Sequence, residues 1–196
     1  ADTLRGQAAS VLGVPNDKLR VITEDVGGAF GMKAAVYPEY VAVLVGARKL
    51  GRPVHWMSTR SEAFVTDTQA RDTVTHVELA CDDKGKFLAL RVRHLCNQGA
   101  YVSTAGVNIN TNNFARCLPG MYRIAKIDVG VACYFSNTIP IGPYRGAGRP
   151  EANYALERAV EEAARLLQMD QVRLRKKNLI PASAMPFKTP INTYDS

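Results

Sequence analysis

Two clusters of glycines lie more than a hundred residues apart, and each combines glycines with an aromatic ring and at least one cationic side chain. The first cluster is VGGAFGMK at residues 26–33, and the second is PYRGAGRP at residues 143–150. Glycine lets the backbone turn and expose its amide groups, and several neighbouring amides can bind an anion. Both clusters therefore predict loops that surround a flat, anionic ligand.

The first cluster lies between a predicted strand and a predicted helix. Alternating β-branched residues predict strands at Leu19–Thr23 and Val54–Ser58, and Pro38 opens an apolar helix at Glu39–Leu50. The loop after the first strand of such a strand–helix–strand unit exposes amides to phosphates. The spacing GGxFG matches neither the dinucleotide fingerprint GxGxxG nor a P-loop, which excludes an ordinary member of either class. The alternative is a tight turn whose Phe30 packs into the core.

The second cluster immediately precedes the longest predicted helix, Glu151–Leu167. Gly146 and Gly148 are placed to present amides near the positive end of this helix, where Arg145 and Arg149 add fixed charge. The planar guanidinium of Arg145 can donate two hydrogen bonds to a carbonyl or carboxylate group. The alternative is a flexible connection that carries two surface arginines.

The remaining patterns predict a mixed α+β fold. Thr73–Ala80 and Lys86–Leu95 alternate on either side of an Asp-Asp-Lys-Gly turn, which predicts an antiparallel hairpin. Ile124–Phe135 predicts a further strand paired with the hairpin, and Gly99–Gly120 predicts a long functional loop. A helix at Gln171–Lys177 follows Asp170 as its cap. We expect a mixed sheet with the strand–helix–strand unit, the hairpin and C-terminal helices.

Residues 1–196 are expected to form one domain that is a piece of a larger subunit, with a division near residues 60–71 and a loop-like tail at residues 179–196. A short helix is predicted at Leu4–Leu12. The long helix is expected to bury one apolar stripe. The stripe consists of Tyr154, Leu156, Ala159, Val160, Ala163, Leu166 and Leu167.

The composition argues against several classes of function. The chain carries a net charge of +7, but its Lys and Arg residues are scattered and do not alternate with aromatic residues, which argues against a nucleic-acid partner. No apolar run reaches the roughly 20 residues that span a bilayer, so no membrane partner is expected and the predicted location is cytoplasmic. Arg71 and Asp72 are expected to form a surface or structural pair.

No metal ligand is expected from this chain. Its three histidines are isolated in the sequence, and its four cysteines are widely spaced without a CxxC pair, which argues against an iron–sulfur cluster or a zinc site. Reduced, buried thiols are expected. The cysteines are Cys81, Cys96, Cys117 and Cys133.

The ordered series of motifs resembles a known family. The motifs are LGVPNDKLRVITED, VGGAFGMK, GRPVHWMSTRSEAF, DDKGKFLALRV, NQGAY, PYRGAGRPEANYALER and VRLRKKNLI. Together they resemble the molybdopterin-binding large subunit of the xanthine dehydrogenase, aldehyde oxidase and carbon monoxide dehydrogenase family, over essentially the whole chain. The resemblance implies a molybdenum–molybdopterin cofactor, in the cytosine dinucleotide form, with no His or Cys ligand from this chain.

The resemblance also implies roles for both glycine clusters. The first would pass close to the metal and donate main-chain hydrogen bonds, and the second would line the substrate side. The implied cofactor-binding residues are Gly27, Gly28, Ala29, Phe30, Gly31, Tyr144, Gly146, Ala147, Gly148 and Arg149. Arg145 would orient the substrate and stabilise negative charge that develops on it. The catalytic base, a glutamate, would belong to a later domain.

The implied reaction is hydroxylation of an aldehyde or an N-heterocycle with water as the oxygen source. Electrons would leave through iron–sulfur clusters and FAD on partner subunits. Two departures limit the substrate. Gly146 stands where copper-containing carbon monoxide dehydrogenases carry a cysteine, and Ala34 stands where xanthine-type enzymes carry a substrate-binding glutamate.

Two alternatives stay open: a carbon monoxide dehydrogenase-like large subunit, and a non-enzymatic nucleotide- or anion-binding module that uses its basic charge. The partners implied by the resemblance are the remainder of the large subunit, an iron–sulfur subunit, an FAD subunit and a small-molecule substrate. The isolated piece is expected to be inactive, because the base and half of the cavity wall are missing. Apolar surface left uncovered predicts self-association.

Overall fold

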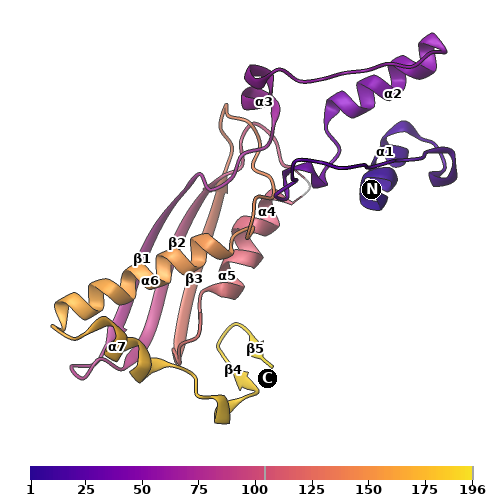
Figure 1. Cartoon of the computed structure of the whole chain (residues 1–196). Coiled ribbons are helices and arrows are strands. Elements are labelled where there is room, and N and C mark those ends of the chain that lie inside the picture. Colours follow the sequence, from indigo (N-terminus) through magenta and orange to yellow (C-terminus); the bar gives the residue numbers. More distant parts are fainter. Residues whose placement is uncertain (104, 196) are drawn as a thin grey trace.

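A computed structural model describes residues 1–103 and 105–195 and contains a mixed sheet with helices, which confirms the α+β class (Figure 1). Helices α1 and α2 lie beyond one end of the sheet, and α6 runs along one of its faces. The longer elements are α1 Asp2–Leu12, α2 Pro38–Leu50, α3 Arg60–Thr66, β1 Thr73–Cys81, β2 Phe87–Asn97, α5 Phe114–Cys117, β3 Lys126–Tyr134, α6 Arg149–Leu166 and α7 Gln171–Asn178. The shorter ones are η1 Asn16–Lys18, η2 Met32–Ala34, α4 Gly106–Asn108, the π-helix η3 Ile109–Asn113, η4 Ala182–Ala184, β4 Phe187–Lys188 and β5 Thr193–Tyr194.

The sheet has the strand order β1-β2-β3, with β1 antiparallel and β3 parallel to β2. This confirms the predicted hairpin and its pairing with a third strand. The carboxylate of Asp82 fixes the hairpin turn, because it accepts hydrogen bonds from the amides of Lys84 at 3.0 Å and Lys86 at 2.8 Å. These bonds stabilise the ionised form, so the pKa of Asp82 is lowered.

The core lies between this sheet and α6. Val92 on β2 packs in one buried cluster with Phe114, Leu156 and Val160, all fully inaccessible to solvent. His94 lies in the same layer, with Nδ1 at 2.7 Å from the Thr75 hydroxyl. Its ring stacks on Phe114 with the centroids 3.7 Å apart.

Only part of the predicted apolar stripe of α6 is buried. Leu156, Val160 and Ala163 face the sheet, as expected, but Tyr154 is 70% exposed and Leu166 is 68% exposed. Alanines at other positions take their places in the interface, because a helix packed on a sheet buries the residues nearest the contact line whatever their size. The small residues that are buried are Ala152, Ala155 and Ala164.

The predicted strand–helix–strand unit is wrong. Helix α2 forms as expected, with Pro38 in its first turn and Gly51 at its end in the left-handed conformation, but Leu19–Thr23 and Val54–Ser58 form no strand. Both segments are extended and line one apolar hollow with α1 and α2. Within the described residues neither has a ladder partner, and a strand requires inter-strand hydrogen bonds as well as a suitable sequence.

The predicted loop at Gly99–Gly120 is also partly wrong, because its second half is helical. Helix α4, the π-helix and α5 follow one another without interruption from Gly106 to Cys117. Asn and Thr side chains suggested a loop, yet Thr111 Oγ1 bonds to the Val107 carbonyl at 2.7 Å within the helix. Residue 104, in the first half of this loop, lies outside the described residues.

The remaining local predictions are confirmed or extended. Asp170 caps α7 by accepting a hydrogen bond from the Arg173 amide at 2.8 Å, and Gly13 ends α1 in the left-handed conformation. Helix α3 was not predicted, although Thr59 and Glu62 form a capping box at its start. The tail is mostly irregular and contains the two-residue strands β4 and β5. No helix in residues 1–103 or 105–195 is long and apolar enough to cross a bilayer.

Buried His94 predicts a core that is sensitive to acid. Burial lowers the pKa of His94 to about 4, from about 6.5 in an unfolded chain. The unfolded chain therefore takes up this proton at higher pH than the folded chain. The free energy of unfolding should decrease as the pH falls from about 6.5 to about 4, by up to about 3 kcal/mol. Urea unfolding across this range measures the slope.

Two variants test the assignment. His94→Gln removes the titrating group, so we expect a smaller pH dependence of the unfolding free energy. His76→Gln is the matched control, because His76 lies on the exposed face of β1. An unchanged slope in His94→Gln would show that another group is responsible.

Candidate functional site

The structure brings the two glycine clusters into contact. A Cβ atom added to Gly31 would lie 3.0 Å from the Pro143 carbonyl oxygen and 3.1 Å from its carbonyl carbon. The φ angle of Gly31 is +97°, in a region that residues with side chains rarely adopt. Both the close approach and the backbone conformation therefore require glycine at this position.

Left-handed backbone is concentrated in these two loops. In the first, Gly28, Phe30 and Gly31 have positive φ angles, and in the second Gly146, Ala147 and Gly148 do. Among the described residues only Phe30, Arg71, Ala147 and Gln168 have positive φ without being glycine, and the first three belong to this region. Such conformations persist where the surroundings fix them, and they are frequent at binding sites.

The first loop exposes its ring and its amides. Phe30 is 55% exposed, which contradicts the alternative of a turn whose Phe30 packs into the core. The ring instead folds back over Gly28, where an added Cβ would touch it. Within the described residues, the main-chain amides from Gly27 to Gly31, including that of Ala29, donate to no acceptor. This loop therefore offers a row of hydrogen-bond donors to a ligand.

The second loop is anchored at its C-terminal end. Gly148 is buried with no room for a Cβ beside the Ile109 carbonyl oxygen, and Asn113 Nδ2 donates to the Ala147 carbonyl at 3.1 Å. Arg149 Nη1 donates to the Gly146 carbonyl at 3.2 Å. The π-helix thus supports this loop from the side of the core.

Arg145 differs from its neighbours because its guanidinium is exposed and, among the described residues, forms no hydrogen bond or ion pair. The amide of Arg145 also has no acceptor within the described part of the chain. Arg145 is therefore the cation in this loop that can bind an incoming anion or carbonyl group without breaking an internal contact.

Sequence reasoning missed Arg71, which was expected to pair with Asp72. Its Nε lies 3.2 Å from Glu151 Oε1, and its Nη2 donates to the Arg145 carbonyl at 2.5 Å. The guanidinium carbon also lies 4.8 Å from the centre of the Tyr144 ring. The positions are remote in sequence, so no local pattern could have revealed these contacts. Asp72 instead accepts a hydrogen bond from an asparagine at the end of β2.

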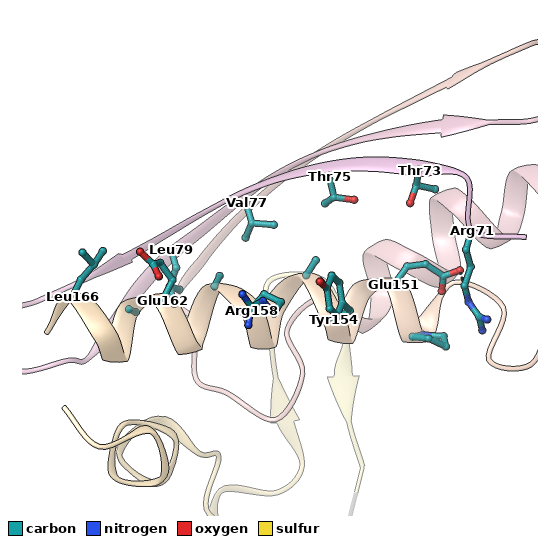
Figure 2. Close-up of a pocket in the computed structure, with 14 residues that line it drawn as sticks. Arg71, Thr73, Thr75, Val77, Leu79, Glu151, Tyr154, Arg158, Glu162 and Leu166 are labelled. Carbon is teal, nitrogen blue, oxygen red and sulfur yellow. Dashed lines mark ion pairs between the residues drawn. The ribbon is translucent and has the colours of Figure 1, made fainter. Parts of the chain in front are cut away.

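Arg71 and Glu151 also stand at one end of an open groove of about 1070 Å³ between β1 and α6 (Figure 2). Thr75, Val77 and Leu166 line its length. Neither Phe30 nor Tyr144 lines this groove, so it is separate from the contact between the two loops.

The donor set of the two loops fits an anionic cofactor. Within the described residues no three His, Cys, Asp or Glu side chains gather in a way that could hold a metal ion. Cys96 is buried, which raises the pKa of its thiol to about 12 and keeps it protonated. The loops offer amides and arginines, which bind phosphate and other anionic groups.

Comparison with known proteins supports this interpretation. The sequence model of the molybdopterin cofactor-binding domain matches residues 1–179. The carbon monoxide dehydrogenase large chain of Hydrogenophaga pseudoflava is 35% identical over 98% of this chain and 24% of its own length. The gamma subunit of the 6-hydroxypseudooxynicotine dehydrogenase complex of Paenarthrobacter nicotinovorans is 32% identical over 91% of this chain and 22% of its own length.

Solved structures agree with the sequence comparison. Quinoline 2-oxidoreductase from Pseudomonas putida 86 superposes with a TM-score of 0.93 and 31% identity, over 98% of this chain and 25% of that one. Reconstituted CO dehydrogenase from Oligotropha carboxidovorans superposes with a TM-score of 0.89 and 35% identity, over 95% of this chain and 24% of that one. The chain thus spans about a quarter of the length of these relatives. It belongs to the molybdopterin cofactor-binding domain family.

Proposed function

We propose that this chain is part of a molybdenum hydroxylase large subunit and that its two glycine loops bind the cofactor and orient the substrate. The observation that carries the proposal is the contact of two left-handed loops at Gly31 and Pro143, with unpaired amides on one loop and the uncommitted Arg145 on the other. Membership of the family supports the same site. A family match alone would not say which residues face the ligand.

The bound molybdenum–molybdopterin would supply a metal centre that accepts two electrons from the substrate. The chain's own task is to hold hydrogen-bond donors in place, because preorganised donors stabilise negative charge as it develops. The amides of Gly27, Gly28, Ala29, Phe30 and Gly31 would bind the cofactor from one side. Residues Tyr144, Gly146, Ala147, Gly148 and Arg149 would contact it from the other.

Arg145 would orient the substrate. Its guanidinium can donate two parallel hydrogen bonds to a carbonyl or carboxylate group, and this geometry selects planar substrates. We place the general base outside this chain, because no glutamate of the chain stands in the family's catalytic motif.

The geometry at Gly146 favours an aldehyde or N-heterocycle over carbon monoxide as the substrate. Copper-containing carbon monoxide dehydrogenases would carry a cysteine here. In this structure φ of Gly146 is +97°, and an added Cβ would overlap the Pro150 ring. A cysteine would therefore require the loop to change shape. Carbon monoxide dehydrogenase-like activity remains the second candidate, since relatives of that name are 35–36% identical.

We further infer the molecular context of the subunit. The relatives are named as large chains or as a subunit of a complex, which supports further subunits as partners. Our proposal is that these are the remainder of the large subunit, an iron–sulfur subunit and an FAD subunit. The cytosine dinucleotide form of the cofactor is part of the same proposal. All four cysteines are free, which suits a reducing cytoplasmic location.

Gly31→Ala should weaken cofactor binding in a full large subunit that contains this chain. The alanine would have to adopt φ near +97° and press against Pro143. Strain of about 1.4 kcal/mol would lower cofactor affinity roughly tenfold. Molybdenum and pterin content under limiting cofactor measures the effect.

The control is Gly6→Ala. Gly6 lies in α1, outside both loops, a Cβ added there meets no heavy atom within 4 Å, and its φ is not positive. We expect normal cofactor content for this variant. Equal losses in both variants would mean that the contact with Pro143 has no special role.

Arg145→Met should reduce oxidation without loss of cofactor. Removing one charged donor from a reacting site lowers kcat/KM by about 10²–10³-fold. The control is Arg158→Met on α6, whose guanidinium is exposed and pairs with Glu161 at 2.7 Å. Steady-state kinetics and molybdenum content of both variants are compared. A normal kcat/KM in Arg145→Met would remove Arg145 from the substrate site.

The alternative of a non-enzymatic anion-binding module predicts a different result. A module would lose nucleotide affinity in Arg145→Met and show no oxidation in any context.

The purified chain alone should hold little molybdenum or pterin, turn over no substrate and self-associate through its uncovered apolar surface. Stoichiometric cofactor, or light scattering of a monomer at high concentration, would contradict these expectations.

A further inference from the structure

We propose that Arg71 is the positioning residue of the substrate-side loop and that it fixes the backbone from which Arg145 projects. This inference rests on the proposed function for its catalytic consequence, whereas its structural claim stands on the contacts themselves. Arg71 lies just before β1, about seventy residues away from the loop that it contacts.

The Arg71 guanidinium makes three contacts, two of them with the loop and one with α6. Nη2 donates to the main-chain carbonyl of Arg145, the charged plane lies near the Tyr144 ring, and Nε pairs with Glu151 at the start of α6. Arg71 thus contacts two consecutive residues, the Tyr144 ring and the Arg145 carbonyl. Together these contacts restrict both the position and the rotation of the loop backbone. Lysine has no planar fork and cannot make the three contacts together.

The partner of Arg71 is itself restricted. The Glu151 side chain is only 10% exposed, and Arg71 is its only ion-pair partner in the described part of the chain. A carboxylate so far removed from water requires a compensating charge. Arg71 is therefore held at the helix end by Glu151 while its other nitrogen holds the loop.

The backbone of Arg71 supports this assignment. Its φ is +66°, in the left-handed region that few residues other than glycine adopt. An arginine keeps this conformation where its side-chain contacts repay the strain. The conformation directs the side chain away from the adjoining strand and toward α6 (Figure 2).

The consequence concerns Arg145. Its own guanidinium is exposed and uncommitted, so its reach is set by the position of its main chain. With Arg71 in place the carbonyl of Arg145 is fixed, and the flexible side chain starts from one point. Without Arg71 the segment from Tyr144 to Gly146 would keep its anchors at Gly148 and at Gly142–Pro143 but lose the side-chain contacts that hold it between them.

Limited trypsin digestion of the full chain tests the structural claim without any cofactor. Trypsin can cleave after Arg145, whereas the bond after Arg149 is protected because Pro150 follows it. Arg71→Ala should increase the rate of cleavage at Arg145–Gly146 by at least about tenfold, since cleavage follows the population of the opened loop. Mass spectrometry identifies the cut, and circular dichroism verifies the fold.

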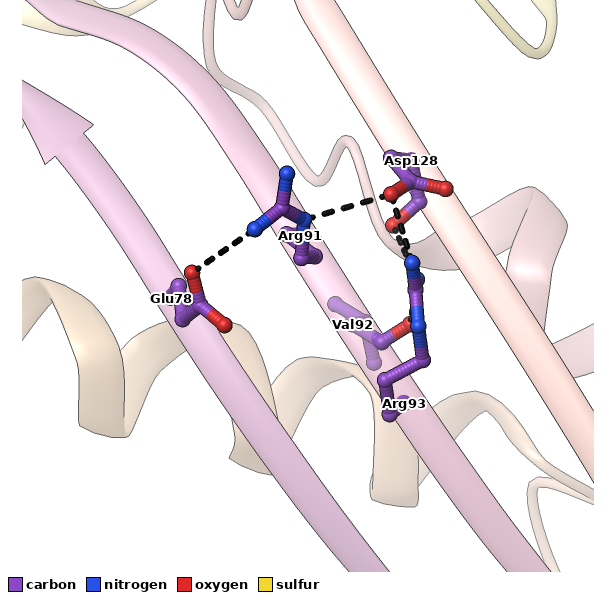
Figure 3. A network of polar contacts seen from close by, with 5 residues as sticks. All are labelled: Glu78, Arg91, Val92, Arg93 and Asp128. Carbon is purple, nitrogen blue, oxygen red and sulfur yellow. Dashed lines mark hydrogen bonds and ion pairs between the residues drawn. The ribbon is translucent and has the colours of Figure 1, made fainter.

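The matched control is Arg91→Ala. Arg91 also bridges acidic side chains, Glu78 and Asp128, each at 3.3 Å, but it does so on the sheet face opposite α6 (Figure 3). We expect normal protection of the Arg145–Gly146 bond in this variant. Arg71→Lys keeps the charge for Glu151 and guards against misfolding of the alanine variant, and it should be cleaved at an intermediate rate.

Unchanged protection in folded Arg71→Lys, together with unchanged protection in folded Arg71→Ala, would overturn the proposal. Faster cleavage at all sites equally would overturn it as well, because it would show global destabilisation. These outcomes are independent of whether the subunit oxidises anything, so they are distinguishable from failure of the proposed function.

Kinetics of the cofactor-loaded large subunit test the catalytic consequence. Arg71→Lys should lower kcat/KM mainly through a higher KM, with unchanged molybdenum content. The double variant Arg71→Lys/Arg145→Met should be no slower than Arg145→Met alone, because Arg71 acts through Arg145. Additive losses would mean that Arg71 acts elsewhere.

Discussion

The close approach of two backbones at Gly31 and Pro143 is the constraint on which the site depends. The second loop is continuous with α6 and is therefore positioned by the main core. The first loop lies between α1 and α2, before the strands of the sheet, and it contacts the second loop at this point. Tyr37 reinforces the connection, since its hydroxyl lies 3.0 Å from the Met32 carbonyl and 3.1 Å from the Thr68 hydroxyl. The Gly31–Pro143 contact and the Tyr37 hydrogen bonds thereby connect the segment around the first loop to Thr68 and to the second loop.

Local chemistry explains which elements were predictable. The hairpin depends on the Asp82 turn, α7 on the Asp170 cap and α6 on Pro150, and each signal lies within a few residues of the structure that it produces. The glycine loops belong to the same class, because four of their glycines mark positions of positive φ, although the positive φ of Phe30 and of Ala147 has no such signal in the sequence. The pairing of the two clusters came only from resemblance to a family, since no local pattern links Gly31 to Pro143.

The errors have a common physical origin in contacts that are remote in sequence. Leu19–Thr23 has the composition of a strand, but it packs on helices and meets no ladder partner within the described residues. The helices from Gly106 to Cys117 form because Ile109 and Phe114 are buried, which outweighs the turn preference of the asparagines around them. Arg71 was misjudged for the same reason, because its role depends on Glu151, which is a neighbour only in the folded chain.

The Arg71–Glu151 pair positions the second loop, whereas other contacts stabilise the fold. Taking two charges partly out of water costs about as much free energy as their attraction returns, so such a pair adds little to the stability of the fold. The pair instead orients the Arg71 guanidinium toward the loop. A hydrophobic pair of the same volume could fill this position, but it could not donate to the Arg145 carbonyl. Stability comes instead from the apolar layer between the sheet and α6, where Leu156 and Val160 are fully buried. The polar contacts of Arg71 at the start of α6 therefore position the loop and are not needed for the stability of the fold.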